Sequence, residues 1–211
     1  MLSNKLNLYS EEIPRITLQE LVNTDVDIYS YCQQLETPLY ITDINKVFPS
    51  LEQWAPIFLE NKIGDSTVKV NTSETNVFVD YHHPLEIILK DYSKKINSDN
   101  PNSDGNLYLS ALNIDQNFPV LKSEIYFDSL LPLEKLGLKW LWYGPKGNTT
   151  GLHYDSSDNF FMQLYGEKRW ILSEPNSTLN LHPRSSLSKR RQFQTSIHKY
   201  LILINSQKLK K

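Results

Sequence analysis

Residues 147–155 read GNTTGLHYD and residues 159–172 read NFFMQLYGEKRWIL, and these two neighbouring stretches decide how the fold is interpreted. If the first stretch is extended, the side chains of His153 and Asp155 project to the same side, because alternate residues of a strand share a face. An imidazole and a carboxylate presented together suit a metal ion. Taken alone, a His-x-Asp sequence favours a surface histidine beside a turn carboxylate, so the rest of the chain has to decide.

Short β-prone runs separated by turn residues surround this pair. Gly166-Glu167 predicts a hairpin turn, and apolar spacing upstream predicts helices, one of them ending at Gly64. The expected class is α+β, mainly β, with an α/β region that leads into an antiparallel sheet or barrel. The expected strands are 38–42, 68–70, 76–81, 107–112, 139–143, 153–165 and 168–172, and the expected helices are 16–35, 51–61 and 84–95.

Length and cysteine content limit the number of domains and the kinds of protein that this sequence can encode. A chain of 211 residues can bury an apolar core without disulfides, so one compact domain is expected. Cys32 is the single cysteine, which excludes a disulfide within the chain and favours a reducing compartment. No apolar run approaches a membrane span or a signal-peptide core. We therefore expect an intracellular protein, cytoplasmic or nuclear, that has no membrane partner.

The last 28 residues differ in composition from the rest of the chain. Residues 184–211 contain eight of the 22 Lys and Arg residues, none of the 24 Asp and Glu residues, and neither Gly nor Pro. Because a sheet needs turn-forming residues between its strands, this segment is not expected to continue one. Residues 188–191 and 208–211 could form a basic arm for nucleic acid or nuclear import, but a solvated tail is the default.

The stretch from Gly144 to Pro175 resembles the cupin-like JmjC family of iron(II)/2-oxoglutarate-dependent hydroxylases, its asparaginyl hydroxylases in particular. The resemblance rests on the Gly-Asn-x-Thr approach, the His-x-Asp pair, the Asn four residues after Asp155, and the Gln-x-x-Gly-x-Lys-Arg turn with the Pro that follows. The segments 37–41 and 54–64 also resemble the N-terminal part of that family. The resemblance spans about residues 16–183.

The resemblance implies a fold. It is a double-stranded β-helix, the jelly roll of cupin-like JmjC proteins, preceded by an α/β region. Residues 1–105 match the α/β N-terminal region, residues 106–183 match part of the core with the His-x-Asp motif, and residues 184–211 form a divergent basic tail. The core is expected to be incomplete.

The resemblance also implies ligands for each cofactor. His153 and Asp155 match the first two iron(II) ligands. Lys168 matches the lysine that pairs with the distal carboxylate of the cosubstrate 2-oxoglutarate, while Tyr108 and Thr150 match hydroxyl groups that hydrogen-bond the same end. The chemistry agrees, because a buried dicarboxylate needs a fixed cation and neutral donors.

The resemblance gives two further polar residues less specific roles. Asn159 matches a residue near the cosubstrate and metal, and Gln163 one on the same strand that faces cosubstrate or substrate. Taken singly, the three residues matched to 2-oxoglutarate each have an ordinary interpretation. Lys168 is then a solvated lysine beside a turn, Tyr108 a strand aromatic, and Thr150 a β-former. Their combination with the His-x-Asp pair favours the functional reading.

The family's third iron ligand is a histidine much farther along the chain, in a strand announced by a Pro-x-x-Trp-Trp-His-like motif. The sequence has no such motif after the pair, and His182 and His198 follow too closely to be that ligand, so both are interpreted as surface histidines. The adjacent His82-His83 is interpreted as an exposed pair. One hypothesis is that a frameshift, alternative splice or intron read-through has replaced the segment after Pro183.

Two functions follow from these patterns. The first is an iron(II)- and 2-oxoglutarate-dependent dioxygenase of the hydroxylase or demethylase type that acts on a protein or peptide side chain, with tRNA or another nucleic acid as a weaker alternative substrate. The second is a catalytically inactive binding or dimerisation module that lacks the distal histidine ligand, in which a homodimer would cover the unpaired edges of the sheet.

Overall fold

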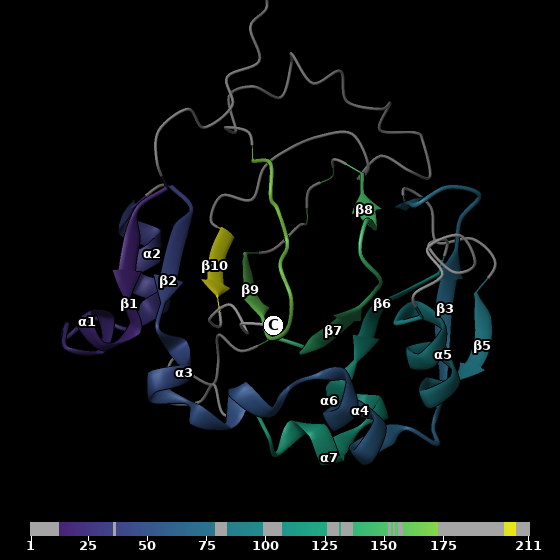
Figure 1. Ribbon diagram of the computed structural model, residues 1–211. Helices are drawn as coiled ribbons and strands as arrows, with labels where there is room; N and C mark the ends of the chain where they lie inside the picture. The colour runs from purple at the N-terminus through teal and green to yellow at the C-terminus, as the bar shows by residue number, and fades with distance from the viewer. Residues whose placement is uncertain are drawn as a thin grey trace, which may run out of the picture. The chain divides into compact units, whose positions relative to one another are not determined.

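The structure is a computed structural model whose chain divides into two compact units (Figure 1). Unit 1 comprises residues 1–52, 128–135 and 152–211, and unit 2 comprises residues 53–127 and 136–151. The structure describes residues 13–35, 37–78, 84–98, 107–125, 131, 137–151, 153, 155, 158–172 and, as backbone, 201–205.

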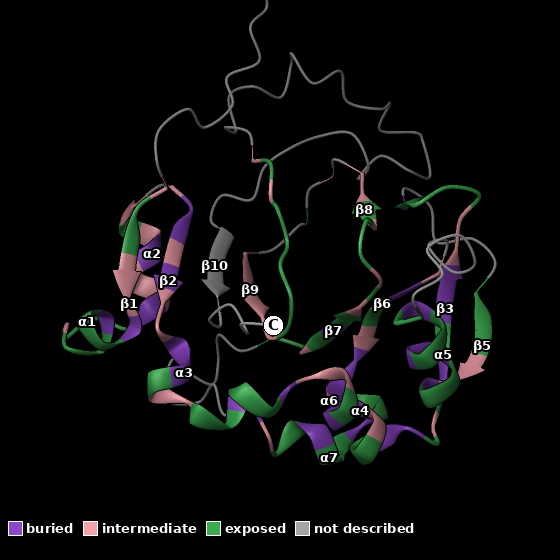
Figure 2. Ribbon diagram, viewed as in Figure 1, coloured by how far each residue is buried: buried purple, intermediate pink, exposed green. Residues whose placement is uncertain are grey.

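Unit 1 is built on a parallel sheet of four strands in the order β1-β2-β10-β9. Residues on β2 alternate between buried and half-buried, as Figure 2 shows, because alternate side chains of a strand face opposite sides. The core includes Leu18, Ile28, Cys32 and Ile41, which are each less than 5% exposed. The elements are β1 (Arg15–Thr17), α1 (Leu18–Val22), α2 (Ile28–Leu35), β2 (Leu39–Thr42), α3 (Ile44–Val47), β9 (Asn159–Gln163) and β10 (Leu201–Asn205), and η1 (Pro49–Gln53) lies at the boundary with unit 2.

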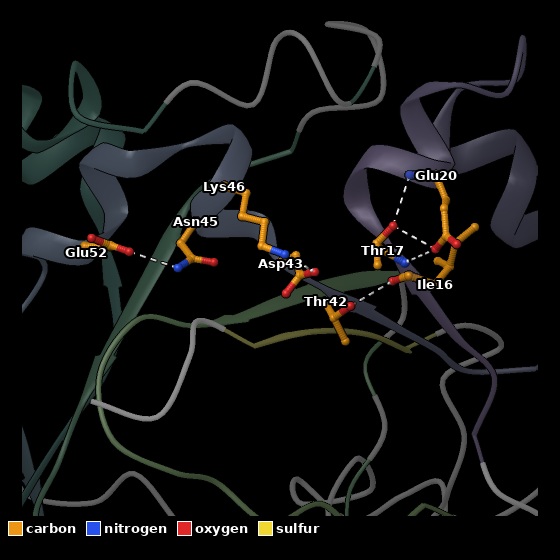
Figure 3. Close-up of polar contacts among 8 residues, drawn as sticks. All are labelled: Ile16, Thr17, Glu20, Thr42, Asp43, Asn45, Lys46 and Glu52. Carbon is orange, nitrogen blue, oxygen red and sulfur yellow. Dashed lines mark hydrogen bonds and ion pairs between the residues drawn. The ribbon is translucent and has the colours of Figure 1, made fainter. Parts of the chain in front are cut away.

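Local hydrogen bonds fix the turns that follow β1 and β2 (Figure 3). Thr17 and Glu20 form a reciprocal capping box, in which the Thr17 Oγ1 accepts from the Glu20 N–H and the Glu20 carboxylate accepts from the Thr17 N–H. The Thr42 hydroxyl donates to the carbonyl of Ile16 at 3.5 Å, which ties the two strands together. β1 and β2 are therefore held in a defined register, and Arg15 is the partner of Tyr40 across it.

Unit 2 contains a sheet of four antiparallel strands in the order β5-β3-β6-β7 and a short parallel pair, β4-β8. Gly64 is the C-cap of α4, and Pro56 occupies its first turn, where the missing N–H costs nothing. The elements are α4 (Pro56–Ile63), β3 (Thr67–Thr72), β4 (Val77–Phe78), β5 (Leu85–Ile88), α5 (Leu89–Ile96), β6 (Leu107–Asn113), α6 (Ile114–Asn117), α7 (Pro119–Lys122), β7 (Trp140–Tyr143) and β8 (Thr149–Thr150).

A buried tyrosine links the helices of unit 2 to its sheet. The side chain of Tyr92 on α5 is fully buried, and its hydroxyl donates to the Tyr143 carbonyl at 2.6 Å and accepts from the Leu109 N–H at 3.1 Å. Beside it, the buried Ser93 hydroxyl contacts the hydroxyl of Tyr143 at 2.8 Å. α5 is thus connected to β6, which carries Tyr108, and to β7, which precedes β8 with Thr150.

Most elements predicted from the sequence are present, with three corrections in local structure. The single helix predicted over residues 16–35 is two helices, α1 and α2, separated by residues 23–27, and residues 16–17 belong to β1. The predicted helix 84–95 begins only at Leu89, because residues 85–88 pair antiparallel with β3 and tertiary pairing overrides the proline signal. The predicted strand 153–165 is shorter: β9 begins at Asn159, and His153 and Asp155 lie in neither β8 nor β9.

Two predictions about the end of the chain also need correction. Gly166 has a φ of +75°, as a turn requires, but residues 168–172 form no strand that would complete the hairpin. The partner of β9 is instead β10, which lies in the segment predicted not to continue a sheet. A single strand needs no internal turn residue, and the apolar run Leu201–Ile204 has strong β-propensity, so the lack of Gly and Pro did not prevent pairing.

The described elements confirm a mixed α/β protein with an antiparallel sheet. The topology of the described strands does not confirm the jelly roll. The predicted segments 1–105, 106–183 and 184–211 differ from the two compact units and stay a prediction about family architecture. Within the described parts of the chain, no helix has the length and apolar character needed to cross a membrane.

Candidate functional site

The imidazole of His153 and the carboxylate of Asp155 face each other in unit 1. Their Nε2 and Oδ1 atoms are 4.0 Å apart, and the two side chains are 28% and 45% exposed. The predicted proximity of this pair is thus present, although the segment that carries it is irregular rather than a strand. Partial exposure leaves the pair accessible to a small ligand.

Asn159, the first residue of β9, holds the other oxygen of this carboxylate. Its Nδ2 donates to Asp155 Oδ2 at 3.3 Å, so the two oxygens of Asp155 have different neighbours. A hydrogen bond of this kind orients a ligating carboxylate and is a common support for metal sites. The structure therefore gives Asn159 a more specific position than the sequence did.

A helix fixes the segment just before β9. Asp158 accepts hydrogen bonds from the Tyr29 hydroxyl at 3.4 Å and from Gln33 Nε2 at 3.0 Å, and both donors lie on α2. Asp158 was not predicted as a site residue. The available signal was an acidic residue immediately before a strand in the most distinctive stretch of the chain, but the sequence does not reveal its partners 125 and 129 positions away.

The pair fits iron(II) in donor type and nearly in separation. Ligands at about 2.1 Å from a metal and at adjacent octahedral positions lie about 3.0 Å apart, so His153 and Asp155 would have to approach by about 1 Å. A side-chain rotation provides a movement of that size. In the described parts of the chain no group of three or more His, Cys, Asp and Glu side chains could hold a metal, so the structure places no third ligand of a facial triad beside this pair there.

Lys168 lies between two aromatic rings. Its Nζ is 5.1 Å from the ring centroid of Phe161 and 4.9 Å from that of Trp170, and the two rings meet edge to face at 4.7 Å. The residue as a whole is exposed, but the ammonium rests against the rings, and burial there lowers the pKa of Lys168. The ordinary alternative, a solvated lysine beside a turn, agrees with the exposure of the residue, whereas the role of Lys168 toward 2-oxoglutarate stays a prediction.

A pocket of about 310 Å³ adjoins this lysine within unit 1. Its walls come from β1, β2 and the segment after β9. Three of the lining side chains are cations and two are aromatic, and the residues are Ile13, Arg15, Tyr40, Lys168, Arg169 and Trp170. The guanidinium of Arg15 stacks over the Tyr40 ring, with 5.0 Å between Cζ and the ring centroid.

The two predicted hydroxyl residues belong to unit 2, where a single ring connects them. Tyr108 on β6 is 6% exposed and packs against Phe78, with 5.3 Å between ring centroids. Thr150 on β8 is half-buried and is the register partner of the same Phe78. Gly144 makes room for the tyrosine, since a Cβ there would lie 2.6 Å from Tyr108 Cδ2.

Of the remaining residues with predicted roles, Gln163 is described by the structure, whereas the other histidines and the basic segments are not. The amide of Gln163 donates to the carbonyl of Tyr165 at 2.6 Å and so braces the turn after β9. His82, His83, His182 and His198, and the basic residues 188–191 and 208–211, lie outside the described residues, so their predicted roles stay predictions.

Three curated relatives, two of which carry the JmjC name, align with most of this chain. It is 24% identical to "Jumonji C domain-containing protein 5" of Drosophila melanogaster over 74% of this chain and 40% of the relative. It is 27% identical to "JmjC domain-containing protein D" of Dictyostelium discoideum, over 76% of this chain and 39% of the relative. It is 25% identical to "Lysine-specific demethylase 8" of Danio rerio, over 84% and 44%.

The chain therefore spans about two fifths of the length of these three relatives. The family model of the cupin-like domain matches residues 27–207, and so continues past Pro183, where the resemblance in the sequence was expected to end. The predicted resemblance to cupin-like and JmjC proteins is confirmed by these matches. This chain belongs to the cupin-like domain family.

Proposed function

We propose that this chain is an iron(II)- and 2-oxoglutarate-dependent dioxygenase of the hydroxylase or demethylase type. The observation that carries the proposal is the His153 and Asp155 pair, with an imidazole and a carboxylate facing each other and the carboxylate held by Asn159. Membership of the cupin-like domain family and similarity to JmjC proteins support it. The fold that we propose is the jelly roll of that family.

Different residues of this chain would bind the metal and the cosubstrate. His153 and Asp155 would hold the iron(II), and Asn159 would keep the carboxylate oriented. Lys168 would pair with the distal carboxylate of 2-oxoglutarate, and the resemblance assigns Tyr108 and Thr150 to the same cosubstrate. When bound, iron(II) and 2-oxoglutarate supply the oxidative chemistry, whereas the protein positions the reactants and excludes water.

The substrate we propose is a protein or peptide side chain, with a nucleic acid as the alternative. The printed name of one relative, a lysine-specific demethylase, describes that protein and supports the demethylase type as one of the two reaction types. A partner of this kind would approach the exposed face of the His153 and Asp155 pair. An intracellular location stays a prediction.

The decisive experiment measures succinate formed from 2-oxoglutarate by the purified chain with iron(II) and ascorbate. We expect iron-dependent succinate in the wild type and none above background in His153→Ala or Asp155→Ala. Asp25→Ala is the matched control, because it removes an exposed carboxylate of unit 1 that belongs to the segment between α1 and α2, and it should leave the rate unchanged. Equal succinate in all four proteins, or none in the wild type, would contradict the proposal.

The second candidate function is a catalytically inactive binding or dimerisation module. The observation that favours it is that the described residues contain no group of three or more His, Cys, Asp and Glu side chains that could hold a metal. In that case the wild-type chain would neither retain iron(II) nor make succinate, and sedimentation would detect a dimer. A monomer that turns over 2-oxoglutarate would exclude it.

A further inference from the structure

Helix α2 has one face fixed in the core of unit 1. Its residues Ile28 and Cys32, four positions apart, are 4% and 3% exposed. The helix begins directly after Asp27, whose carboxylate accepts from the Ser30 N–H at 3.0 Å, as the side chain of an N-cap residue does. A helix that is held at its first turn and along one face is a firm support for the side chains beside that face.

The residue that follows each of these two core positions contacts Asp158. Tyr29 and Gln33 are also four positions apart and therefore lie on one face of α2. The hydroxyl of Tyr29 donates to Asp158 Oδ2 at 3.4 Å, and Gln33 Nε2 donates to the same oxygen at 3.0 Å. All three side chains are half-buried, so these hydrogen bonds are stronger than they would be in water, and the Gln33 contact is the shorter of the two.

This contact constrains the segment that carries the candidate metal ligands. Asp158 immediately precedes Asn159, the first residue of β9, whose Nδ2 donates to Asp155 Oδ2 at 3.3 Å. Because successive side chains of an extended chain face opposite sides, Asp158 can reach α2 while Asn159 reaches back to Asp155. His153 and Asp155 lie outside β8 and β9, so the hydrogen bonds of those strands do not fix them, and side-chain contacts have a larger part in their position.

We propose that Gln33 is a positioning residue for the pair of His153 and Asp155, and that it acts by holding Asp158. The inference rests on the proposed function for the identity of the ion that the pair binds. It adds a residue of α2, a helix outside the motifs on which the resemblance rests. The contact itself forms without a metal, so it can be tested without one.

Manganese(II) affinity of the full chain, measured by titration with electron paramagnetic resonance, is the first test. Gln33→Leu removes the donor and keeps a side chain of similar size. We expect it to weaken binding about three- to tenfold, less than the about 10- to 100-fold typical of a residue that contacts a ligand directly, because Gln33 acts through Asp158. Gln34→Leu is the matched control, since it makes the same change at the neighbouring, exposed position of α2 and should leave the affinity unchanged.

Hydrogen exchange of the metal-free chain, followed by mass spectrometry, is the second test. The peptide that contains residues 153–163 should exchange about fivefold faster in Gln33→Leu than in the wild type or Gln34→Leu, because one hydrogen bond that opposes local opening is lost. A peptide of β3 in unit 2 is the internal reference and should exchange alike in all three proteins. Tyr29→Phe, which removes the longer hydrogen bond, is a milder second variant and should change both measurements in the same direction.

A reversed pair separates a direct contact from a general weakening of the fold. Gln33→Glu places a second carboxylate against that of Asp158 and should weaken manganese(II) binding more than Gln33→Leu does. Combining it with Asp158→Asn restores a hydrogen bond with donor and acceptor exchanged, so the double variant should bind manganese(II) within about threefold of the wild type. A double variant that binds no better than Gln33→Glu alone would overturn the inference.

The inference and the proposed function fail separately. Manganese(II) binding that is lost in His153→Ala but equal in Gln33→Leu and Gln34→Leu would overturn the inference and leave the proposed function standing. Equal exchange of residues 153–163 in the two glutamine variants would also overturn the inference. A wild-type chain that binds no manganese(II), with faster exchange in Gln33→Leu alone, would support the inference and contradict the dioxygenase.

Discussion

Replacing Tyr92 by Phe tests how unit 2 positions its candidate residues. The change removes one hydroxyl and retains the ring, so packing is nearly conserved. The hydroxyl accepts from the buried N–H of Leu109 and donates to the carbonyl of Tyr143. An unsatisfied buried N–H costs about 1–3 kcal/mol and a lost hydrogen bond about 1 kcal/mol, so we expect a loss of about 2–4 kcal/mol in the free energy of unfolding.

Urea unfolding, followed by tryptophan fluorescence and circular dichroism, measures this loss. With a slope of about 2 kcal/mol per molar urea, the midpoint should fall by about 1–2 M. Tyr165→Phe is the control, because Tyr165 is 49% exposed and its hydroxyl should contribute less than about 0.5 kcal/mol. A loss below about 0.5 kcal/mol for Tyr92→Phe would refute the idea that this hydroxyl joins α5 to the sheet.

Three further predictions concern the site and the core. Asn159→Leu removes the donor to the paired carboxylate and should weaken manganese(II) binding about 10- to 100-fold in a metal titration, while an unchanged affinity would exclude an orienting role. Gly144→Ala places a Cβ against the Tyr108 ring and should cost about 1–3 kcal/mol in urea unfolding, whereas Gly137→Ala, which meets nothing within 4 Å, should cost far less. Burial raises the pKa of Cys32 to about 12, so the unfolded chain loses its thiol proton first, and stability should fall by about 1.4 kcal/mol per pH unit above about pH 8.5 relative to Cys32→Ala; equal alkaline slopes for the two proteins would contradict this.

Apolar spacing was a sufficient guide where local preference and tertiary structure agree. It predicted α4, β2, β6 and β7, and it predicted helix over residues 16–35, where the structure has α1 and α2 with a break at residues 23–27. It failed at residues 85–88, where pairing with β3 decides the conformation, and at β10, whose partners are distant in sequence. Local patterns contain no information about which strand will lie alongside.

The candidate site also combines features that the sequence predicts with features that it does not predict. The proximity of His153 and Asp155 followed from their spacing, although the strand invoked to explain it is absent. The contact of Asn159 with Asp155 and the anchoring of Asp158 by α2 require the folded chain to be seen. The cationic pocket is formed by β1, β2 and the segment after β9, so no single stretch of sequence could have indicated it.

Manganese(II) binding, followed by electron paramagnetic resonance with and without 2-oxoglutarate, tests the central claim most directly. The account predicts one tightly bound ion per chain, whose affinity 2-oxoglutarate increases, and loss of that ion in both His153→Ala and Asp155→Ala but not in Asp25→Ala. An ion that binds equally well to the two site variants, or a wild-type chain that binds none, would contradict it.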